Sequence, residues 1–176
     1  LDGRFSEFVD IVTAQQQVEE NWYKGTADAV FQNLDAIRYN RPEYVLVLSG
    51  DHVYKMDYGR LLAEHAHSRA DVTVACVEVP IAEASGFGVI GVDDSRRVTS
   101  FVEKPADPPE MPDRPGMSLA NMGVYVFNAR FLYEVLGRDA VDPQSSHDFG
   151  KDLIPHLLEK ARVQAHRYAR SCVNMV

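Results

Sequence analysis

The sequence predicts an α/β fold: a mostly parallel mixed sheet with helices on both faces. Helical and strand-like segments alternate through most of the 176 residues, and this alternation is typical of crossover connections between parallel strands. The run at 44–48 is continuously apolar, as expected for a strand with both faces covered. Two apolar segments, 87–92 and 98–103, flank the polar stretch DDSRR, which favours a hairpin turn and therefore a mixed edge of the sheet.

The remaining elements follow from apolar periodicity and from residues that start or stop a helix. A helix is predicted over 27–37, where apolar residues recur at the helical period before Pro42. Asp57 is the expected N-cap of a second helix. The other expected elements are a short amphipathic helix at 5–12, strands at 71–79, 122–127 and 163–168, and helices at 129–136 and 148–160. Ser145 or Ser146 is the expected N-cap of the last of these helices.

A proline-rich stretch interrupts this alternation. Five prolines fall within 104–116, and so many residues without a backbone N–H exclude a helix or a central strand. The stretch is therefore expected to be either an ordered excursion from the sheet or a lid.

The composition is that of an ordinary globular domain, with 45% hydrophobic and 25% charged residues. The formal net charge is −8, from 18 Lys+Arg against 26 Asp+Glu. This charge argues against sequence-independent binding of nucleic acid and against binding to an anionic membrane. Cys76 and Cys172 are too few for a disulfide framework, and Cys76, in an apolar stretch, is expected to be a buried free thiol. No stretch reaches the roughly 20 apolar residues of a membrane span, so a cytoplasmic protein is expected. The chain starts at Leu1 without an initiator Met, which suggests a fragment of a longer protein.

Asp51 is the first candidate for a functional residue. It follows the apolar run at 44–48, and Gly50 between them lets the backbone bend. Sheets of this class bind ligands outside the carboxyl ends of their strands, where Asp51 would lie. An Asx-turn that merely caps the strand end is the alternative interpretation.

Three other stretches combine glycine, aromatic and charged residues at the ends of elements. Gly25 and Thr26 stand before a helix, where free backbone N–H groups suit a phosphate or a base edge. Trp22 and Tyr23, just before them, fit either a stacking wall or the core. The stretch SGFGV at 85–89 indicates a β-bulge or a close approach of the backbone to a ligand.

Glu103 and Lys104 leave the end of a predicted strand together. Pro105 favours an extended conformation for Lys104, so the two side chains are expected to point to opposite faces. A solvated strand end is the alternative to a role in binding. The histidines offer no zinc site, because His65 and His67 are two residues apart on a predicted helix and do not share a face.

Five stretches, in order along the chain, together carry a specific resemblance: NWYKGTADAV, LSGDHVYKMDY, FVEKP, LANMGVYVF and SSHDFGKDLIP. In this order and at these spacings the chain closely resembles the bacterial glucose-1-phosphate adenylyltransferases, also called ADP-glucose pyrophosphorylases, and the resemblance covers essentially its whole length. It implies a Rossmann-like nucleotidyltransferase fold, of which residues 1–176 are the central part of one catalytic domain. The implied reaction, in glycogen synthesis, converts ATP and α-D-glucose 1-phosphate into ADP-glucose and diphosphate with Mg²⁺, in a homotetramer.

The resemblance also implies roles for single residues. Asp51 is implied to be the catalytic carboxylate that helps hold Mg²⁺ between the phosphates, and Lys104 to hold the phosphate of glucose 1-phosphate. Glu103 is implied to accept hydrogen bonds from the sugar hydroxyls. The other implied contacts are Tyr23, the backbone of Gly88 and Asn121 with glucose 1-phosphate, and Gly25 and Thr26 with the nucleotide. Asn121 departs from the Ser that is usual at its position in the enterobacterial type.

Parts of the family pattern fall outside the sequence. The glycine-rich loop that cradles the triphosphate is expected upstream of Leu1, and a second metal-binding Asp and a β-helix domain are expected beyond Val176. The chain alone is therefore predicted to be inactive. Two alternatives remain open: a sugar nucleotidyltransferase that uses UTP or dTTP, and a non-catalytic regulatory subunit of the same fold. The sequence does not identify the allosteric effector.

Overall fold

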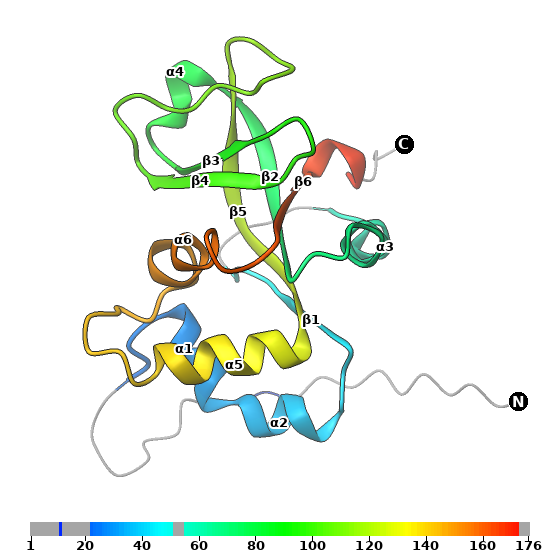
Figure 1. Cartoon of the computed structure of the whole chain (residues 1–176), viewed down its shortest axis with the longest axis vertical. Helices are drawn as coiled ribbons and strands as arrows, with labels where there is room; N and C mark the ends of the chain where they lie inside the picture. The colour runs from blue at the N-terminus through cyan, green and yellow to red at the C-terminus, as the bar shows by residue number, and fades with distance from the viewer. Residues whose placement is uncertain (1–10, 12–21, 51–54, 173–176) are drawn as a thin grey trace, which may run out of the picture.

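The computed structural model describes residues 11, 22–50 and 55–172, and their six strands form one mixed sheet (Figure 1). The strand order is β4-β3-β5-β2-β6, and β1 pairs with β5 beside this path. The strands are β1 (Tyr44–Val47), β2 (Val72–Pro80), β3 (Gly88–Val92), β4 (Val98–Glu103), β5 (Met117–Asn128) and β6 (Val163–Arg167). The mixed α/β class predicted from the sequence is confirmed.

The long strand β5 has different partners along its two halves. Its first half pairs with β3 on one side and with the end of β2 on the other, while its second half lies between β1 and the start of β2. β1 and β3 therefore both border β5, at different heights along it. This arrangement brings the carboxyl end of β1 to the middle of β5.

The expectation of a mostly parallel sheet is wrong. Among the strands in the described ranges, only β2 and β6 pair in parallel, and the other four pairings are antiparallel. β1 and β2, which are joined by a helical connection, do run in one direction, and β6 runs parallel to β2. However, β5 returns after the β3–β4 hairpin and inserts antiparallel between β1 and β2. The helical connection from β1 to β2 thus joins parallel strands that are not neighbours, whereas the one from β5 to β6 joins strands of opposite direction.

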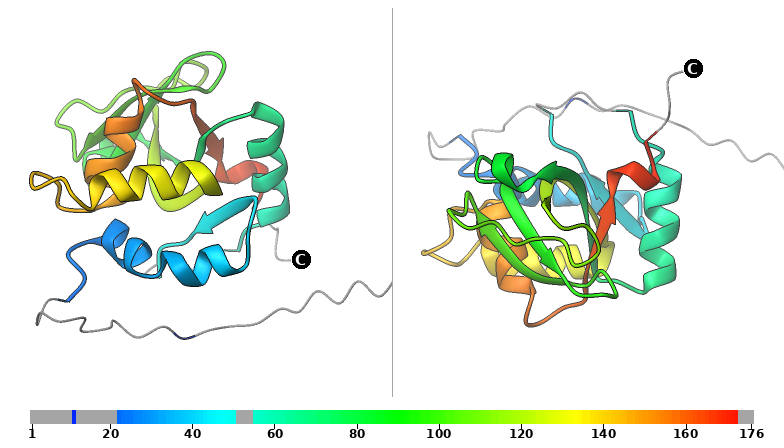
Figure 2. Two further views of the ribbon diagram at one scale, coloured as in Figure 1. Left: turned by 60° about the horizontal axis from the view of Figure 1, so that its bottom comes forward. Right: turned by 90° about the horizontal axis from the view of Figure 1, so that it is seen from above.

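Helices cover both faces of the sheet, as predicted. The helical elements of the described ranges are α1 (Thr26–Gln32), α2 (Leu34–Tyr39), α3 (Tyr58–Ser68), α4 (Ile81–Ala84), α5 (Ala129–Asp139), the π-helical turn η1 (Phe149–Leu153), α6 (Ile154–Leu157) and the 3₁₀ turn η2 (Tyr168–Arg170). Figure 2 shows α3 on one side of the sheet and α5 and α6 on the other. Alternate residues of β2 face the two layers: Val72 and Val74 face α5 and α6, and Ala75 faces α3.

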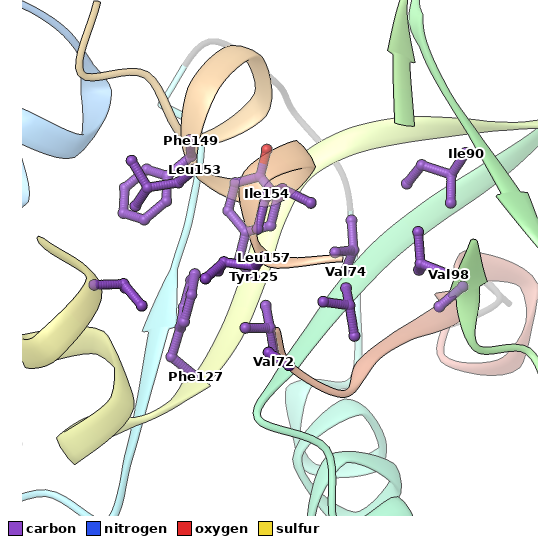
Figure 3. Close-up of a cluster of buried hydrophobic side chains, with 14 of the residues drawn as sticks. Val72, Val74, Ile90, Val98, Tyr125, Phe127, Phe149, Leu153, Ile154 and Leu157 are labelled. Carbon is purple, nitrogen blue, oxygen red and sulfur yellow. The ribbon is translucent and has the colours of Figure 1, made fainter. Parts of the chain in front are cut away.

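The main core lies on the face covered by α5, η1 and α6 (Figure 3). The ring of Phe149 stacks on that of Tyr125 at a centroid distance of 5.5 Å and lies 5.7 Å from that of Phe127. Leu153 and Ile154 of the same segment are also buried. Each fully buried side chain of this size stabilises the fold by about 1.5–3 kcal/mol, so this packing fixes η1 against β5.

Two helix boundaries differ from the sequence prediction. The helix predicted over 27–37 is two helices with a break at Asn33, whose amide donates to the carbonyl oxygen of Ala29 and to the hydroxyl of Tyr23. The predicted cap at Ser145 or Ser146 is also wrong. Asp148 is the N-cap of η1, because its carboxylate accepts the backbone N–H groups two and three residues ahead.

Within the described ranges, the other predicted elements occur close to their predicted places. The N-cap at Asp57 is confirmed by its acceptance of the backbone N–H of Arg60 at 3.3 Å. The proline-rich stretch is an ordered excursion: Met111 is 3% exposed and its N–H donates to the carbonyl oxygen of Met117. The strand β1 is only half-buried, so the expectation that both its faces are covered is not met.

Glu64, on α3, joins several segments at the edge of the sheet. It accepts a hydrogen bond from Nδ1 of the buried His166 at 2.5 Å and pairs with Arg96 and Arg170. Burial alone raises the pKa of Glu64, but the hydrogen bond from His166 and the charges of His166 and Arg96 bring this pKa down to about 2. The other ring nitrogen of His166 contacts the hydroxyl of Ser171 at 2.8 Å, so the network fixes β6 and η2 against α3.

Cys76 is a buried free thiol, as predicted, and burial raises its pKa. None of the helices within the described ranges is long and apolar enough to cross a bilayer. The predicted helix at 5–12 lies, apart from Ile11, outside the described residues, and so does Asp51.

Candidate active site

The candidate site begins where β5 bends. Gly123 has a φ of +66°, and its N–H donates to Oδ1 of Asn121 at 3.1 Å. On the neighbouring strand the register shifts between Ala75 and Cys76. A Cβ on Gly123 would lie 3.1 Å from that of Ser49, so both the dihedral angle and the close approach favour glycine here. The bend thus seats the end of β1, which leads through Gly50 to Asp51.

Asn121 connects this bend to the core. Its Nδ2 donates to the hydroxyl of Tyr125 at 2.9 Å, and Tyr125 is only 4% exposed. Burial raises the pKa of Tyr125 to about 12; the bond from Asn121 opposes this rise, and the negative charges of Asp148 and Glu103 add to it. The phenol is therefore neutral, and two carboxylates lie close enough to act on it.

The β3–β4 hairpin supplies a second wall. Gly88 pairs directly with Glu103, and a Cβ on Gly88 would meet Oε2 of Glu103 at 2.9 Å and the ring of Phe101 at 3.1 Å. The irregularity in this hairpin falls between Gly91 and Val92, so the bulge interpretation of Gly88 is wrong, and a close approach of its backbone to a ligand stays a prediction. A side chain at Gly88 would therefore require Glu103 and Phe101 to shift.

The hairpin and the bend of β5 meet at Gly150, in η1. A Cβ on Gly150 would lie 3.5 Å from Nδ2 of Asn121, 3.5 Å from the ring of Phe101 and 3.6 Å from Oδ1 of Asp148. Gly88, Glu103 and Asn121, three of the residues predicted from the sequence, are therefore brought together around Phe101. We call this group the sugar-side wall, after the sugar-phosphate contacts that the resemblance implies for three of its members; it consists of Gly88, Phe101, Glu103, Asn121 and Asp148.

The backbone of Lys104 departs from the prediction. Its φ is +46°, which is a left-handed and not an extended conformation, and its N–H donates to the carbonyl oxygen of Phe87 at 3.0 Å. β4 ends at Glu103, so the alternation rule that placed Glu103 and Lys104 on opposite faces does not extend to Lys104. Both residues are exposed, and Pro105 after them is buried.

The start of α1 lies against the loop that precedes η1. The backbone N–H groups of Ala27 and Asp28 donate to the carbonyl oxygen of His147 at 2.8 and 3.4 Å. The expectation that these N–H groups are free for a phosphate is therefore wrong. Thr26 donates its hydroxyl hydrogen to Oδ2 of Asp148 at 2.9 Å and accepts the N–H of Phe149 at 3.1 Å. The segment 25–28 is thus fastened to the sugar-side wall through Asp148.

The two aromatic residues before this segment differ in their surroundings. Trp22 is 79% exposed, so the core interpretation is wrong for this residue. Tyr23 is half-buried, and its hydroxyl accepts a hydrogen bond from Asn33 at 3.1 Å. The contact with glucose 1-phosphate that the resemblance implies for Tyr23 stays a prediction.

Sequence reasoning did not assign Phe101, Tyr125 or Asp148 to the site. Asp148 was expected only to serve a helix start, which it does, but its other oxygen binds Thr26. The sequence signal for this dual role is weak, because a capping Asp has the same pattern whether or not it lines a site. Phe101 and Tyr125 each follow the alternation of a buried strand and give no further signal.

The described residues contain no group of three or more His, Cys, Asp or Glu side chains that could hold a metal ion. His65 is instead bonded to Thr73 at 2.7 Å and to Asn128 at 3.1 Å, and burial lowers its pKa. The implied metal ligand Asp51 lies outside the described residues, so its role stays a prediction.

Comparison with known proteins places the chain among enzymes of one kind. The nucleotidyl transferase family model matches residues 2–171. A glucose-1-phosphate adenylyltransferase of Methylobacillus flagellatus is 62% identical over 98% of this chain and 40% of the relative. The proteins of the same name from Nitrosospira multiformis and Nitrosomonas europaea are 59% and 62% identical, over 100% and 99% of this chain and 41% of each relative.

These relatives confirm the resemblance inferred from the sequence, and the chain spans about two fifths of their length. The match of the family model extends through β1, the bend of β5, the hairpin and η1, which are the elements that build the site. The chain therefore belongs to the nucleotidyl transferase family.

Proposed function

We propose that the protein containing this chain transfers the adenylyl group of ATP to α-D-glucose 1-phosphate, giving ADP-glucose and diphosphate. The observation that carries the proposal is the meeting of Gly88, Glu103 and Asn121 in one wall that Asp148 joins to the segment 25–28. Relatives that are 55–62% identical bear the name of this activity, which supports the same assignment.

The sugar-side wall suits a phosphorylated sugar. Glu103 is an exposed carboxylate that accepts hydrogen bonds from hydroxyl groups, and Lys104 beside it provides a cation for the phosphate. Gly88 carries no side chain that would hold a sugar ring away from its backbone. Asn121 is held by Tyr125 and Gly123, so its amide is fixed in orientation before the sugar phosphate binds.

In the proposed reaction a phosphate oxygen of the sugar phosphate attacks the α-phosphorus of ATP. The bond from this phosphorus to the bridging oxygen breaks, and diphosphate leaves in line with the attack. The task of the chain is to hold two anions in this geometry, with Gly25 and Thr26 on the nucleotide side and Tyr23 on the side of the sugar phosphate. Because the amides of Ala27 and Asp28 are bonded to His147, we assign the phosphates to other groups and the base to this segment.

Mg²⁺ is the proposed cofactor, and the donor available in this chain fits it. Asp51 follows the end of β1 that is seated against the bend of β5, and a carboxylate oxygen is the ligand that Mg²⁺ prefers. Bound Mg²⁺ supplies neutralisation of the phosphate charge. Its remaining ligands are proposed to come from the substrates, from water and from parts of the protein outside the described residues.

Several expectations from the sequence go beyond this activity and stay predictions. They are a role in glycogen synthesis, allosteric control, a cytoplasmic homotetramer, and a catalytic domain completed by an upstream glycine-rich loop and followed by a β-helix. The chain alone is predicted to have little or no turnover, and ADP-glucose formation by the 176-residue chain above a no-enzyme control would contradict this.

The proposed function is tested by diphosphate release from the full-length protein with glucose 1-phosphate, Mg²⁺ and each of ATP, UTP, dTTP and GTP. Release with ATP that is lost in Asp51→Asn is the expected result. Asp94→Asn, in the exposed hairpin turn, is the matched control and is expected to keep full activity. Release only with UTP or dTTP would assign that nucleotide, and not ATP, as the substrate. No release with any nucleotide would favour a non-catalytic regulatory subunit.

A further inference from the structure

The loop 145–148, which we call the clasp, connects three parts of the molecule that are distant in sequence. It follows α5, precedes η1 and contacts the start of α1. On one side it carries Asp148 of the sugar-side wall, and on the other it binds the segment 25–28. The clasp is thus the connection between the two halves of the proposed site.

The clasp is fastened to the end of α5 by one carboxylate. Asp139 accepts the hydroxyl of Ser145 on Oδ1 at 2.6 Å, and its Oδ2 lies 2.8 Å from Nδ1 of His147. The backbone N–H of His147 in turn donates to the hydroxyl of Ser145 at 2.9 Å. His147 is only 8% exposed, so this set of hydrogen bonds is shielded from water.

The backbone of His147 then holds α1. Its carbonyl oxygen accepts the N–H groups of Ala27 and Asp28, the bonds that a helix start otherwise leaves to a cap or a ligand. The contact is close, because a Cβ on Gly25 would meet this oxygen at 2.4 Å and that of Ser146 at 2.5 Å. The φ of His147 is +58°, a left-handed conformation that the side-chain bond to Asp139 helps to hold.

Within the described ranges, the hydrogen bonds that join the segment 25–28 to η1 and to the loop before it involve either the side chain of Thr26 or the backbone oxygen of His147. Thr26 binds Asp148 and Phe149 by its side chain, and the carbonyl oxygen of His147 binds the two backbone N–H groups. Asp148 is independently fixed, since it caps η1 and η1 is packed in the core. A change at His147 that moves its backbone is therefore expected to shift the segment 25–28, which keeps its bonds through Thr26, and to leave the sugar-side wall in place.

We propose that His147, held by Asp139, is a positioning residue that sets the nucleotide-side segment 25–28 against the sugar-side wall. It touches neither substrate and acts through the start of α1. This inference rests on the proposed function for the identity of the two substrates. It predicts that loss of the His147 side chain weakens nucleotide binding selectively and spares the sugar phosphate.

The test uses His147→Gly, which removes the side chain and permits the left-handed backbone, and His147→Asn, which permits it and keeps a donor for Asp139. His156→Ala is the control, because His156 is exposed on α6. All variants are made in the full-length protein. Binding of ATP and of glucose 1-phosphate is measured by calorimetry, and amide hydrogen exchange is followed in peptides that cover 22–32.

The expected result for His147→Gly is a dissociation constant for ATP that rises about five- to tenfold, the effect of one lost hydrogen bond to a charged group. The dissociation constant for glucose 1-phosphate stays within twofold, exchange at 26–29 accelerates, His147→Asn restores most of the ATP affinity, and His156→Ala has no effect. An unchanged ATP affinity, an equal loss for both substrates or unchanged exchange would each overturn the proposal.

The binding measurement separates this proposal from the proposed function. A wild-type protein that binds ATP but releases no diphosphate would refute the proposed function alone. A wild-type protein that binds no ATP would refute both.

Discussion

Substitution of Gly25 by alanine tests the contact between α1 and the clasp most directly. The φ of Gly25 is −169°, an extended conformation that any residue adopts, so the new methyl group causes no backbone strain of its own. Its effect is purely steric, because a Cβ at this position would meet three backbone atoms of Ser146 and His147 at 2.4–2.7 Å. Backbone atoms in a bonded loop cannot move aside as a flexible side chain does.

The size of the effect follows from the displacement required. Ordinary contact begins at 3.4 Å, so the clasp and α1 must separate by about 1 Å. The bonds from the N–H groups of Ala27 and Asp28 to His147, now 2.8 and 3.4 Å long, then exceed hydrogen-bond length. Two lost hydrogen bonds at about 1 kcal/mol each, with about 1–2 kcal/mol of repacking, lower the free energy of unfolding by about 3–4 kcal/mol.

Urea unfolding of the 176-residue chain, followed by circular dichroism, measures this change. Gly137→Ala is the matched control. Gly137 lies in α5, and a methyl group there would meet no other part of the chain within 4 Å, so alanine raises the free energy of unfolding by about 0.5–1 kcal/mol. Replacement of glycine by alanine is thus expected to lower the free energy of unfolding at Gly25 and to raise it at Gly137. If Gly25→Ala lowered the free energy of unfolding by less than about 1 kcal/mol, the reasoning would be refuted. Such a result would mean that the clasp shifts to accept the methyl group and still keeps its hydrogen bonds to α1.

Three further predictions concern the stability and reactivity of the same chain. Glu64→Gln is expected to lower the free energy of unfolding by about 1–2 kcal/mol at pH 7, less than the full pKa shift implies because its partners are partly exposed. Because the pKa of Glu64 is lower in the folded than in the unfolded chain, this difference should be present above pH 4.5 and disappear as the pH falls towards 2; a constant difference in urea unfolding across this range would contradict it. Cys172 is expected to react with a thiol reagent in the native chain and Cys76 only after unfolding, since Cys76 is fully buried with a raised pKa; equal rates in a timed assay with mass spectrometry would argue against this. Asp57→Ala should cost about 1 kcal/mol through loss of the cap of α3, measured by thermal unfolding, whereas Asp57→Asn should keep most of it.

The sequence predicted most elements and their order, because apolar periodicity is a local property. It did not predict the position of β5, since its insertion between β1 and β2 depends on contacts between residues far apart in the chain. The break at Asn33 also escaped prediction. Asn33 donates there to the carbonyl oxygen of Ala29 and to the hydroxyl of Tyr23, which precedes the helix and has no place in the helical period.

For the site, residue types alone suggested single positions, and only the resemblance to a known family suggested that they act together. Alternation even separated Glu103 from Lys104, because nothing in the residue order indicates that Lys104 takes a left-handed backbone. The meeting of Glu103 with Asn121 depends on β3 and β5 being neighbours and on the packing of η1 over both. Asp148 has an ordinary capping pattern, so its second bond to Thr26 was invisible before the fold was known.

The placement of β1 beside β5 also has a consequence for how the chain acquires its structure. In the described part of the sheet, β1 pairs only with β5. The backbone groups of Tyr44 can therefore form their strand hydrogen bonds only once the region of Asn128 is present. During synthesis the strand that leads to Asp51 therefore stays unpaired until the hairpin and β5 have emerged. Pairing between such distant segments is slow. The end of the site that carries Asp51 is thus expected to form among the last parts of the domain, and partly folded chains are expected to expose β1 as an edge open to association.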